Sequence, residues 1–371
     1  MIYLDYNASA PVKPAIRTAV MEAMERHGNP SSVHRFGRIA KRHVEEARAS
    51  VAAFAGVKPA QVIFTSGGTE TNNMALRALS GANIITSSIE HDSILACVAD
   101  AQRMPVTAEG LIDLAMAEKI LKSAPPRSIV SVMLVNNETG VIQPVEDIAR
   151  LTKACGHIIH TDAVQAAGRL PLDFAALGVD MLTLSAHKIG GPKGIGALIV
   201  AEKLALQSMI KGGGQEMNSR AGTENVPGIV GFGVAAQLAA DDLLDMPRLT
   251  AMRDELQARL QEIGGEDAVV LGANTPRVAN TLCIAMRGMN SETQVMGMDL
   301  AGVAVSAGSA CSSGKVKASH VLRAMGYGEE IASSALRISL GWNTQASDVV
   351  RCIEAWQTLY RRSRARRKKA A

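Results

Sequence analysis

Short strand-like runs alternate with amphipathic helical patterns from about residue 12 to residue 245. The helical patterns, with apolar residues about 3.6 positions apart, lie at 12–26, 33–54, 69–80, 91–103, 113–122 and 144–154. Strand-like runs separate them at 61–65, 83–86, 129–135 and 197–200. This alternation predicts an α/β fold in which helices cover both faces of a mostly parallel sheet. Because such sheets bind ligands at the carboxyl ends of their strands, the polar residues that follow each strand are candidate site residues.

The pattern changes near residue 245, where an acidic stretch is followed by Met246 and Pro247. A long amphipathic helix is predicted beyond it, at about 248–263. Further strands are expected at 280–285, 303–306 and 336–340, and further helices at 291–301 and 345–361. We therefore expect a large α/β domain at 12–245 and a smaller α+β domain formed by 1–11 together with 246–360.

The composition indicates an ordinary soluble globular protein. Of the 371 residues, 47% are apolar and 20% are charged. No apolar run approaches the roughly 20 residues that span a bilayer. The first residues also lack the basic and apolar regions of a signal peptide. The five cysteines are scattered and never spaced as Cys-x-x-Cys, which argues against a disulfide framework and a closed zinc site. We expect a cytoplasmic location.

The net charge of +4 is concentrated at the C-terminus. Seven basic residues lie within 361–369, so that without them the net charge would fall from +4 to −3. A terminal basic run can contact RNA or an acidic protein, but more often it is a solvated tail. We expect 361–371 to be a disordered tail that does not bind RNA.

Two ionisable residues stand at the ends of runs that read as buried strands. Asp162 follows the run at 157–161, and Lys188 lies just beyond the run at 181–184. Buried ionisable groups are costly unless they are paired or used. Such a pair would suit pyridoxal 5'-phosphate (PLP), since the lysine binds the aldehyde and the aspartate keeps the pyridine nitrogen protonated. The alternative is a lysine at the solvent edge of a strand beside an unrelated aspartate.

Four further residues follow predicted strands. Gly68 and Thr69 lie where a tight turn opens a helix, so backbone N–H groups could bind a phosphate there; a simple helix cap is the alternative. His91 begins another helix and could stack on a flat ring or move protons, or it could be a surface histidine. Asn137 follows the run at 129–135, where its amide could bind a substrate carboxylate or a ring hydroxyl.

Cys311 lies in a run of small residues at 305–314. Such a run buries little, so we expect a mobile loop on which the cysteine could act as a nucleophile once it is deprotonated. An incidental cysteine in a flexible linker is the alternative.

Arg337 lies in a strand-like run, where a guanidinium needs a partner. It could bind a substrate carboxylate through two hydrogen bonds, or it could form a structural ion pair.

Together these segments resemble the cysteine desulfurases, which are PLP enzymes of class V and fold type I. The resemblance covers essentially the whole chain and is carried by the sequence around Cys311 and by the segments 3–8, 65–70, 136–138, 162–165 and 185–188. The loop sequence Ser-Ala-Gly-Ser-Ala-Cys-Ser is most similar to the housekeeping and nitrogen-fixation group. The resemblance implies a fold-type I PLP-dependent transferase with a mostly parallel seven-stranded sheet in its large domain.

The resemblance also implies a role for each matching residue. Lys188 would hold PLP and act as acid and base, His91 would stack on the ring, and Cys311 would take the sulfur. Cofactor binding is implied for Gly68, Thr69, Asn137, Asp162, Gln165, Ser185, His187 and Lys188, and substrate binding for Asn7, Asn137 and Arg337. Thr223 would reach the phosphate in the neighbouring subunit, which implies a homodimer.

The implied function is conversion of L-cysteine to L-alanine with a persulfide on Cys311. An acceptor such as an iron–sulfur scaffold protein would then receive the sulfur, for cluster assembly or for thiolation of RNA and cofactors. No resident metal site is expected, although Cys311 could ligate iron or a cluster transiently during transfer. A selenocysteine lyase or another class V PLP aminotransferase is the alternative function.

Overall fold

A central seven-stranded sheet forms the large domain in the computed structural model, which describes residues 1–308 and 318–370. The strand order is β2-β8-β7-β6-β5-β3-β4. The strands are β2 (Val62–Thr65), β3 (Ile84–Ser87), β4 (Gln102–Met104), β5 (Ile129–Ser131), β6 (Ile158–Asp162), β7 (Met181–Ser185) and β8 (Gly196–Val200). Strand β8 is antiparallel to β2 and β7, and the other neighbouring pairs are parallel. The predicted mostly parallel sheet is confirmed.

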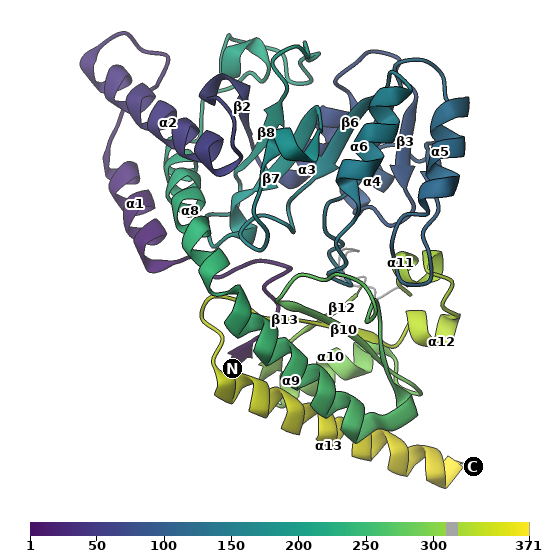
Figure 1. The fold of residues 1–371 in the computed structure, drawn as a ribbon. Helices are drawn as coiled ribbons and strands as arrows, with labels where there is room; N and C mark the ends of the chain where they lie inside the picture. The colour runs from purple at the N-terminus through teal and green to yellow at the C-terminus, as the bar shows by residue number, and fades with distance from the viewer. Residues whose placement is uncertain (309–317, 371) are drawn as a thin grey trace.

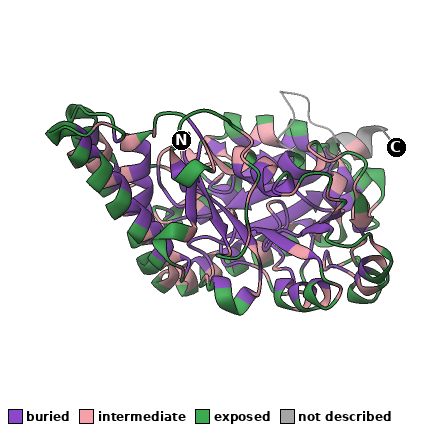
Figure 2. Cartoon of the chain, turned by 90° about the horizontal axis from the view of Figure 1, so that it is seen from above, coloured by how far each residue is buried: buried purple, intermediate pink, exposed green. Residues whose placement is uncertain are grey.

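Helices cover both faces of this sheet (Figure 1). Successive strand residues point to opposite faces, so Leu198 packs in the core that contains Met74 of α3, whereas Ile199 packs in the core that contains Phe232 of α8. The buried strands lie between helices whose outer sides are exposed (Figure 2). The helices are α1 (Pro14–Glu25), α2 (Arg35–Phe54), α3 (Gly68–Leu76), α4 (Asp92–Leu95), α5 (Leu114–Ser123), α6 (Val145–Ala154), α7 (Phe174–Leu177) and α8 (Val226–Leu244).

The small domain contains an antiparallel sheet with the order β12-β13-β10-β9. The chain starts in this domain, because β1 pairs in parallel with β11 and Leu4 is buried in the same core as Leu256 and Trp356. The strands are β1 (Ile2–Tyr3), β9 (Ala268–Val270), β10 (Thr281–Met286), β11 (Val303–Ala304), β12 (Ser306–Ala307) and β13 (Ala335–Ser339). The helices are α9 (Met246–Gly264), α10 (Ser291–Leu300), α11 (His320–Ala324), α12 (Glu329–Ala332) and α13 (Ala346–Ala370).

Short 3₁₀ turns complete the fold, and one of them positions a candidate site residue. The turn Ala186–Lys188 follows β7 directly, and the others are Pro59–Gln61, Glu216–Asn218 and Gly265–Asp267. Asp245 alone separates α8 from α9 and joins the two domains. None of the helices within residues 1–308 and 318–370 is both long and apolar enough to cross a membrane.

The structure differs from the sequence-based expectations in two segments. The helix expected at 91–103 is only α4, and β4 follows it because Gln102–Met104 pairs with β3. Ile94, Cys97 and Val98 still pack in one core, which explains their helix-like spacing. The tail expected to be disordered instead continues α13 as far as Ala370, where Arg367 pairs with Asp267 at 2.8 Å.

Candidate functional site

A cavity of about 210 Å³ lies at the carboxyl ends of the central strands. The neighbouring strands β3, β5, β6 and β7 are parallel, so the segments that follow them meet at one edge of the sheet. The lining includes nine of the residues singled out from the sequence, namely Gly68, Thr69, His91, Asn137, Asp162, Gln165, Ser185, His187 and Lys188. Asn72, Ser93, Met133, Val135 and Val164 complete it.

One end of this cavity is suited to an anion. Gly67 has φ of +149°, a conformation that favours glycine, and it turns the chain from β2 into α3. The Ser185 side chain is 2% exposed, and its hydroxyl oxygen has no hydrogen-bond partner in the described chain. A Cβ on Gly68 would lie 3.6 Å from the Ser185 Cβ, so the hydroxyl sits beside the start of the helix. The helix N-terminus, the glycine backbone and this hydroxyl are the groups that could hold an anion such as a phosphate.

The Asp162 carboxylate is fixed by hydrogen bonds to both of its oxygens. Asn72 Nδ2 donates to Oδ2 at 2.7 Å, and the backbone N–H of Val164 donates to Oδ1 at 2.9 Å. The Asp162 side chain also lines the cavity, so a group bound there would meet a carboxylate of defined position. Such a carboxylate can hold a protonated ring nitrogen.

His91 is connected to Asp162 through two intervening side chains. Asn72 Nδ2 donates to Ser93 Oγ at 2.8 Å, and Ser93 Oγ lies 2.8 Å from His91 Nδ1. The backbone N–H of Ser93 also donates to Nδ1 at 3.1 Å, so this nitrogen accepts and the ring proton belongs on Nε2. Burial is the main cause that lowers the pKa of His91, with Asp162 opposing it. The imidazole is therefore neutral at neutral pH.

Lys188 is held by the N-terminal segment. Its Nζ donates to the main-chain oxygens of Asn7 and Ala8, at 2.5 and 3.0 Å. Gln165 Nε2 donates to the same Asn7 oxygen at 3.0 Å. The neighbouring His187 contacts Ser9 through Nδ1, and its pKa is lowered to about 4 by burial and then by the charge of Lys188. The N-terminal segment thus sets the position of the lysine and of two residues beside it.

Asn7 and Arg337, which the resemblance assigns to substrate, do not line the cavity in the described chain. The Asn7 side chain donates to Thr281 Oγ1 and to the Asn137 carbonyl, and it accepts from Asn280. Arg337 is paired with Asp5 at 2.8 Å, as the structural alternative predicted, and it also donates to the Asn137 carbonyl at 3.1 Å.

Two other predicted site residues lie elsewhere. Cys311 is outside the described residues. Two described residues that flank it, Gly308 and Ser319, both lie at Glu138: Ser319 Oγ donates to the Glu138 carboxyl at 2.5 Å, and a Cβ on Gly308 would approach it to 2.6 Å. Thr223 is exposed and does not line the cavity of its own chain.

Sequence reasoning missed Asn72, Ser93 and Glu90. Glu90 is fully buried, and its Oε1 accepts from the backbone N–H of Met133 at 2.9 Å, next to the cavity. Burial is the main cause that raises the pKa of Glu90 to about 8. The available signal was positional: Asn72 lies one turn into the helix after the glycine turn, and Glu90 and Ser93 flank His91.

Within residues 1–308 and 318–370, no group of three or more His, Cys, Asp or Glu side chains is arranged to hold a metal ion.

The geometry agrees with comparisons to known proteins. The model of the aminotransferase class V family matches residues 2–352. The chain therefore belongs to the class V aminotransferases, a family of PLP-dependent enzymes.

Close relatives narrow this assignment. The cysteine desulfurase IscS of Dictyoglomus turgidum is 38% identical over 367 residues, which cover 94% of this chain and 91% of that protein. An IscS-like cysteine desulfurase of Mycobacterium tuberculosis is 37% identical, with 95% of each chain covered. The X-ray structure of a NifS-like protein from Rickettsia africae has a TM-score of 0.91 and 36% identity, covering 97% of this chain and 99% of that one. Within class V, the chain is a cysteine desulfurase.

Proposed function

We propose that this enzyme transfers the sulfur of L-cysteine to Cys311 and releases L-alanine, with PLP bound in the 210 Å³ cavity. The observation that carries the proposal is the convergence of Lys188, Asp162 and the unpartnered hydroxyl of Ser185 on that cavity. PLP requires an amine for its aldehyde, a carboxylate for its ring nitrogen and donors for its phosphate. One of the solved relatives, a protein named SspA, is described in complex with cysteine.

The residues present fit PLP, and each has a defined part in holding it. The start of α3 and the Ser185 hydroxyl would bind the phosphate, together with Thr69 and His187. Asp162 would hold the ring nitrogen, because Asn72 and the Val164 N–H fix its carboxylate. When bound, PLP withdraws electrons from the substrate and so makes bonds at the substrate Cα easier to break.

His91 and Lys188 would handle protons at the substrate. The neutral imidazole has its ring proton on Nε2 because Nδ1 accepts the Ser93 N–H. Lys188 is held at the same cavity by the carbonyls of Asn7 and Ala8. A lysine amine at this position can both take a proton from the substrate Cα and return one.

Arg337 and Asn137 would bind the substrate carboxylate. The Asn137 side chain lines the cavity, and its main-chain oxygen already accepts from Arg337. Arg337 lies behind Asn137 rather than in the cavity lining, and its Nε has no hydrogen-bond partner in the described chain, so a shift of its side chain would bring one donor to an incoming anion. A guanidinium bound to both Asp5 and a carboxylate would discriminate in favour of amino acids with a free α-carboxylate.

The sulfur leaves the substrate as part of a group transfer. The Cys311 thiolate attacks the substrate sulfur, so that a sulfur–sulfur bond forms while the carbon–sulfur bond breaks. The electron pair of the broken bond stays on the carbon skeleton, which takes up protons to become alanine. No external oxidant or reductant is needed for this step. Release of the persulfide sulfur then requires an acceptor thiol or a reductant, and we propose a sulfur-acceptor or iron–sulfur scaffold protein in a cytoplasmic setting.

A homodimer is supported by the surface of α1 and α2, which project from the large domain (Figure 1). Met24, Val33 and Phe36 lie on or beside these helices and are 70%, 88% and 50% exposed. Large apolar side chains exposed on one part of the surface are suited to an interface that a second chain covers. We propose that Thr223, which is exposed in its own chain, completes the phosphate site of the partner. Light scattering should give twice the chain mass, and Thr223→Ala should lower PLP retention without changing that mass.

The first test is sulfide and alanine release from L-cysteine with a reductant present. We expect wild type to release both in equal amounts and Cys311→Ala to release neither. Cys97→Ala, which changes a half-buried free cysteine of the described chain, is the matched control and should behave as wild type. Equal release by Cys311→Ala and wild type would refute the assigned nucleophile. A PLP-loaded wild type that releases no sulfide would refute the desulfurase reaction for this site.

A further inference from the structure

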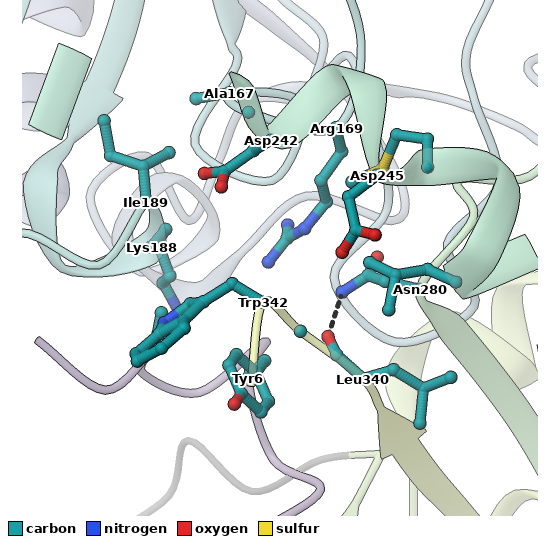
Figure 3. A pocket seen from close by; sticks show the side chains of 15 residues that line it. Tyr6, Ala167, Arg169, Lys188, Ile189, Asp242, Asp245, Asn280, Leu340 and Trp342 are labelled. Atoms are coloured by element: carbon teal, nitrogen blue, oxygen red, sulfur yellow. Dashed lines mark hydrogen bonds between the residues drawn. The ribbon is translucent and has the colours of Figure 1, made fainter. Parts of the chain in front are cut away.

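A second, smaller pocket lies next to the PLP cavity. It has a volume of about 40 Å³, and Lys188 lines both hollows. Arg169 extends its guanidinium into the middle of this pocket, between the side chains of Asp242 and Asp245 (Figure 3). A space of this size accommodates a water molecule but not a substrate. The pocket therefore gives the buried guanidinium of Arg169 space for a water molecule. The reason for burying a guanidinium at this position lies in the contacts that it makes.

Arg169 is buried and lacks an acidic partner of its own. The residue is 8% exposed, and it forms no ion pair with any residue in the described ranges. The two nearby carboxylates are engaged elsewhere, because Asp242 pairs with Lys13 and Asp245 pairs with Arg248. A guanidinium in such a position is costly unless its hydrogen bonds serve a purpose.

Within the described ranges, the side-chain hydrogen bonds of Arg169 all go to one residue of the PLP cavity. Its NH1 group donates to the main-chain oxygen of Gln165 at 2.6 Å and to the side-chain Oε1 of the same residue. Gln165 is 5% exposed, and its Nε2 donates to the Asn7 carbonyl. The oxygen end of the amide is thereby turned toward Arg169, which leaves the second N–H of Nε2 as the polar group that Gln165 can offer to the cavity.

We propose that Arg169 is a positioning residue that fixes the Gln165 amide with its N–H toward the cavity and strengthens that N–H as a donor to the phenolic oxygen of PLP. The inference rests on the proposed function, since it assumes PLP in that cavity. A charge-assisted hydrogen bond to Oε1 polarises the amide, so that the N–H at its other end becomes a better donor. The Asn7 carbonyl alone would fix the orientation of the Gln165 amide less firmly, because that carbonyl also accepts a hydrogen bond from Lys188.

The charged groups around Arg169 leave it protonated under assay conditions. Burial is the main cause that lowers its pKa, to about 9, followed by the charge of Arg337, and Asp242 opposes both. Arg169 consequently stays a cation near neutral pH. A donor aimed at the phenolic oxygen stabilises the anionic form of that oxygen, which lowers the pH at which the bound cofactor loses its proton.

The test is a pH titration of the visible absorption band of the PLP-loaded enzyme without substrate. Arg169→Met should raise the midpoint by about 0.5 to 1 pH unit relative to wild type. Arg169→Lys keeps a cationic donor and should recover most of that shift. Arg169→Gln keeps a neutral donor and should raise the midpoint by less than Arg169→Met does. If the Arg169→Met protein does not fold, the Arg169→Gln protein takes its place in the test.

A double-variant comparison separates action through Gln165 from a direct effect of charge. In a Gln165→Leu background, Arg169→Met should add less than half of the shift that it causes in wild type. An equal shift in both backgrounds, or an unchanged midpoint in folded Arg169→Met and Arg169→Gln, would overturn the inference and leave the desulfurase assignment intact. Wild type without any PLP band would instead refute the proposed function.

Discussion

Replacing Ser319 with alanine removes two hydrogen bonds at one buried position. Ser319 is 2% exposed; its hydroxyl donates to Glu138 at 2.5 Å and, as the N-cap of α11, accepts from the Leu322 N–H at 3.1 Å. Loss of a serine cap costs about 1 kcal/mol, and an unsatisfied buried polar partner costs about 1–3 kcal/mol. We expect Ser319→Ala to lower the free energy of unfolding by about 2–4 kcal/mol.

The loss of stability caused by Ser319→Ala should grow as the pH rises. Burial raises the pKa of Glu138, and the Ser319 hydroxyl is the largest of the causes that oppose this. A carboxyl whose pKa is raised on folding makes the native state less stable as the pH rises toward that pKa. Removing Ser319 raises the pKa further, because the hydrogen bond favours the charged form. The variant should therefore lose more stability, relative to wild type, at higher pH.

Urea unfolding of the PLP-loaded protein, followed by tryptophan fluorescence at about pH 6 and about pH 8, measures both effects. Ser123→Ala is the matched control: its hydroxyl donates to the Ile120 carbonyl at an exposed position, and its replacement should change stability by less than about 0.5 kcal/mol. A Ser319→Ala loss no larger than the control, or one that shrinks as the pH rises, would refute the reasoning.

Three other changes follow from buried polar groups. Glu216→Gln should lower the free energy of unfolding by about 3–5 kcal/mol, because it removes the buried carboxylate charge that pairs with Arg48 at 2.7 Å; a loss below about 1 kcal/mol in urea unfolding would contradict this. Burial lowers the pKa of His160 to about 3, so wild type should lose stability as the pH falls from about 6.5 toward that value. In the same assay, His160→Gln should reduce this loss of stability at acid pH. A loss as large as that of wild type would show that another group causes it. Ser185→Ala should weaken PLP retention about 10-fold or more while leaving the unloaded protein as stable as wild type; equal retention after dialysis would remove Ser185 from the phosphate site.

Much of the site could be predicted because it follows from the topology. In a mostly parallel sheet, the residues that end successive strands meet at one edge, so the positions of Asp162 and Lys188 after their strands were enough to place them together. Thr69 and His91 were found for the same reason, since each begins the helix that follows a strand. Residue-by-residue resemblance added Gln165, Ser185 and His187, whereas Asn72 and Ser93 of the lining were missed.

The parts that could not be predicted depend on which side chain packs against which. Asn72 connects Asp162 to Ser93, a contact across three separate segments that no local pattern encodes. The helix expected at 91–103 failed because pairing of Gln102–Met104 with β3 overrides a helix-like spacing. The pairing of Arg337 with Asp5 was one of two open readings, and only the three-dimensional structure brings the two residues together.

The N-terminal segment contacts residues that are synthesised long after it. Asn7 contacts Lys188 and Gln165 of the large domain and Thr281 of the small domain. During synthesis, the hydrogen bond between Asn7 and Thr281 can form only after some 270 further residues have been made. Contacts of such long sequence separation form late and slowly. The carbonyl partners of Lys188 thus take their final places only after both domains have folded, so the position of that side chain depends on the folding of both domains.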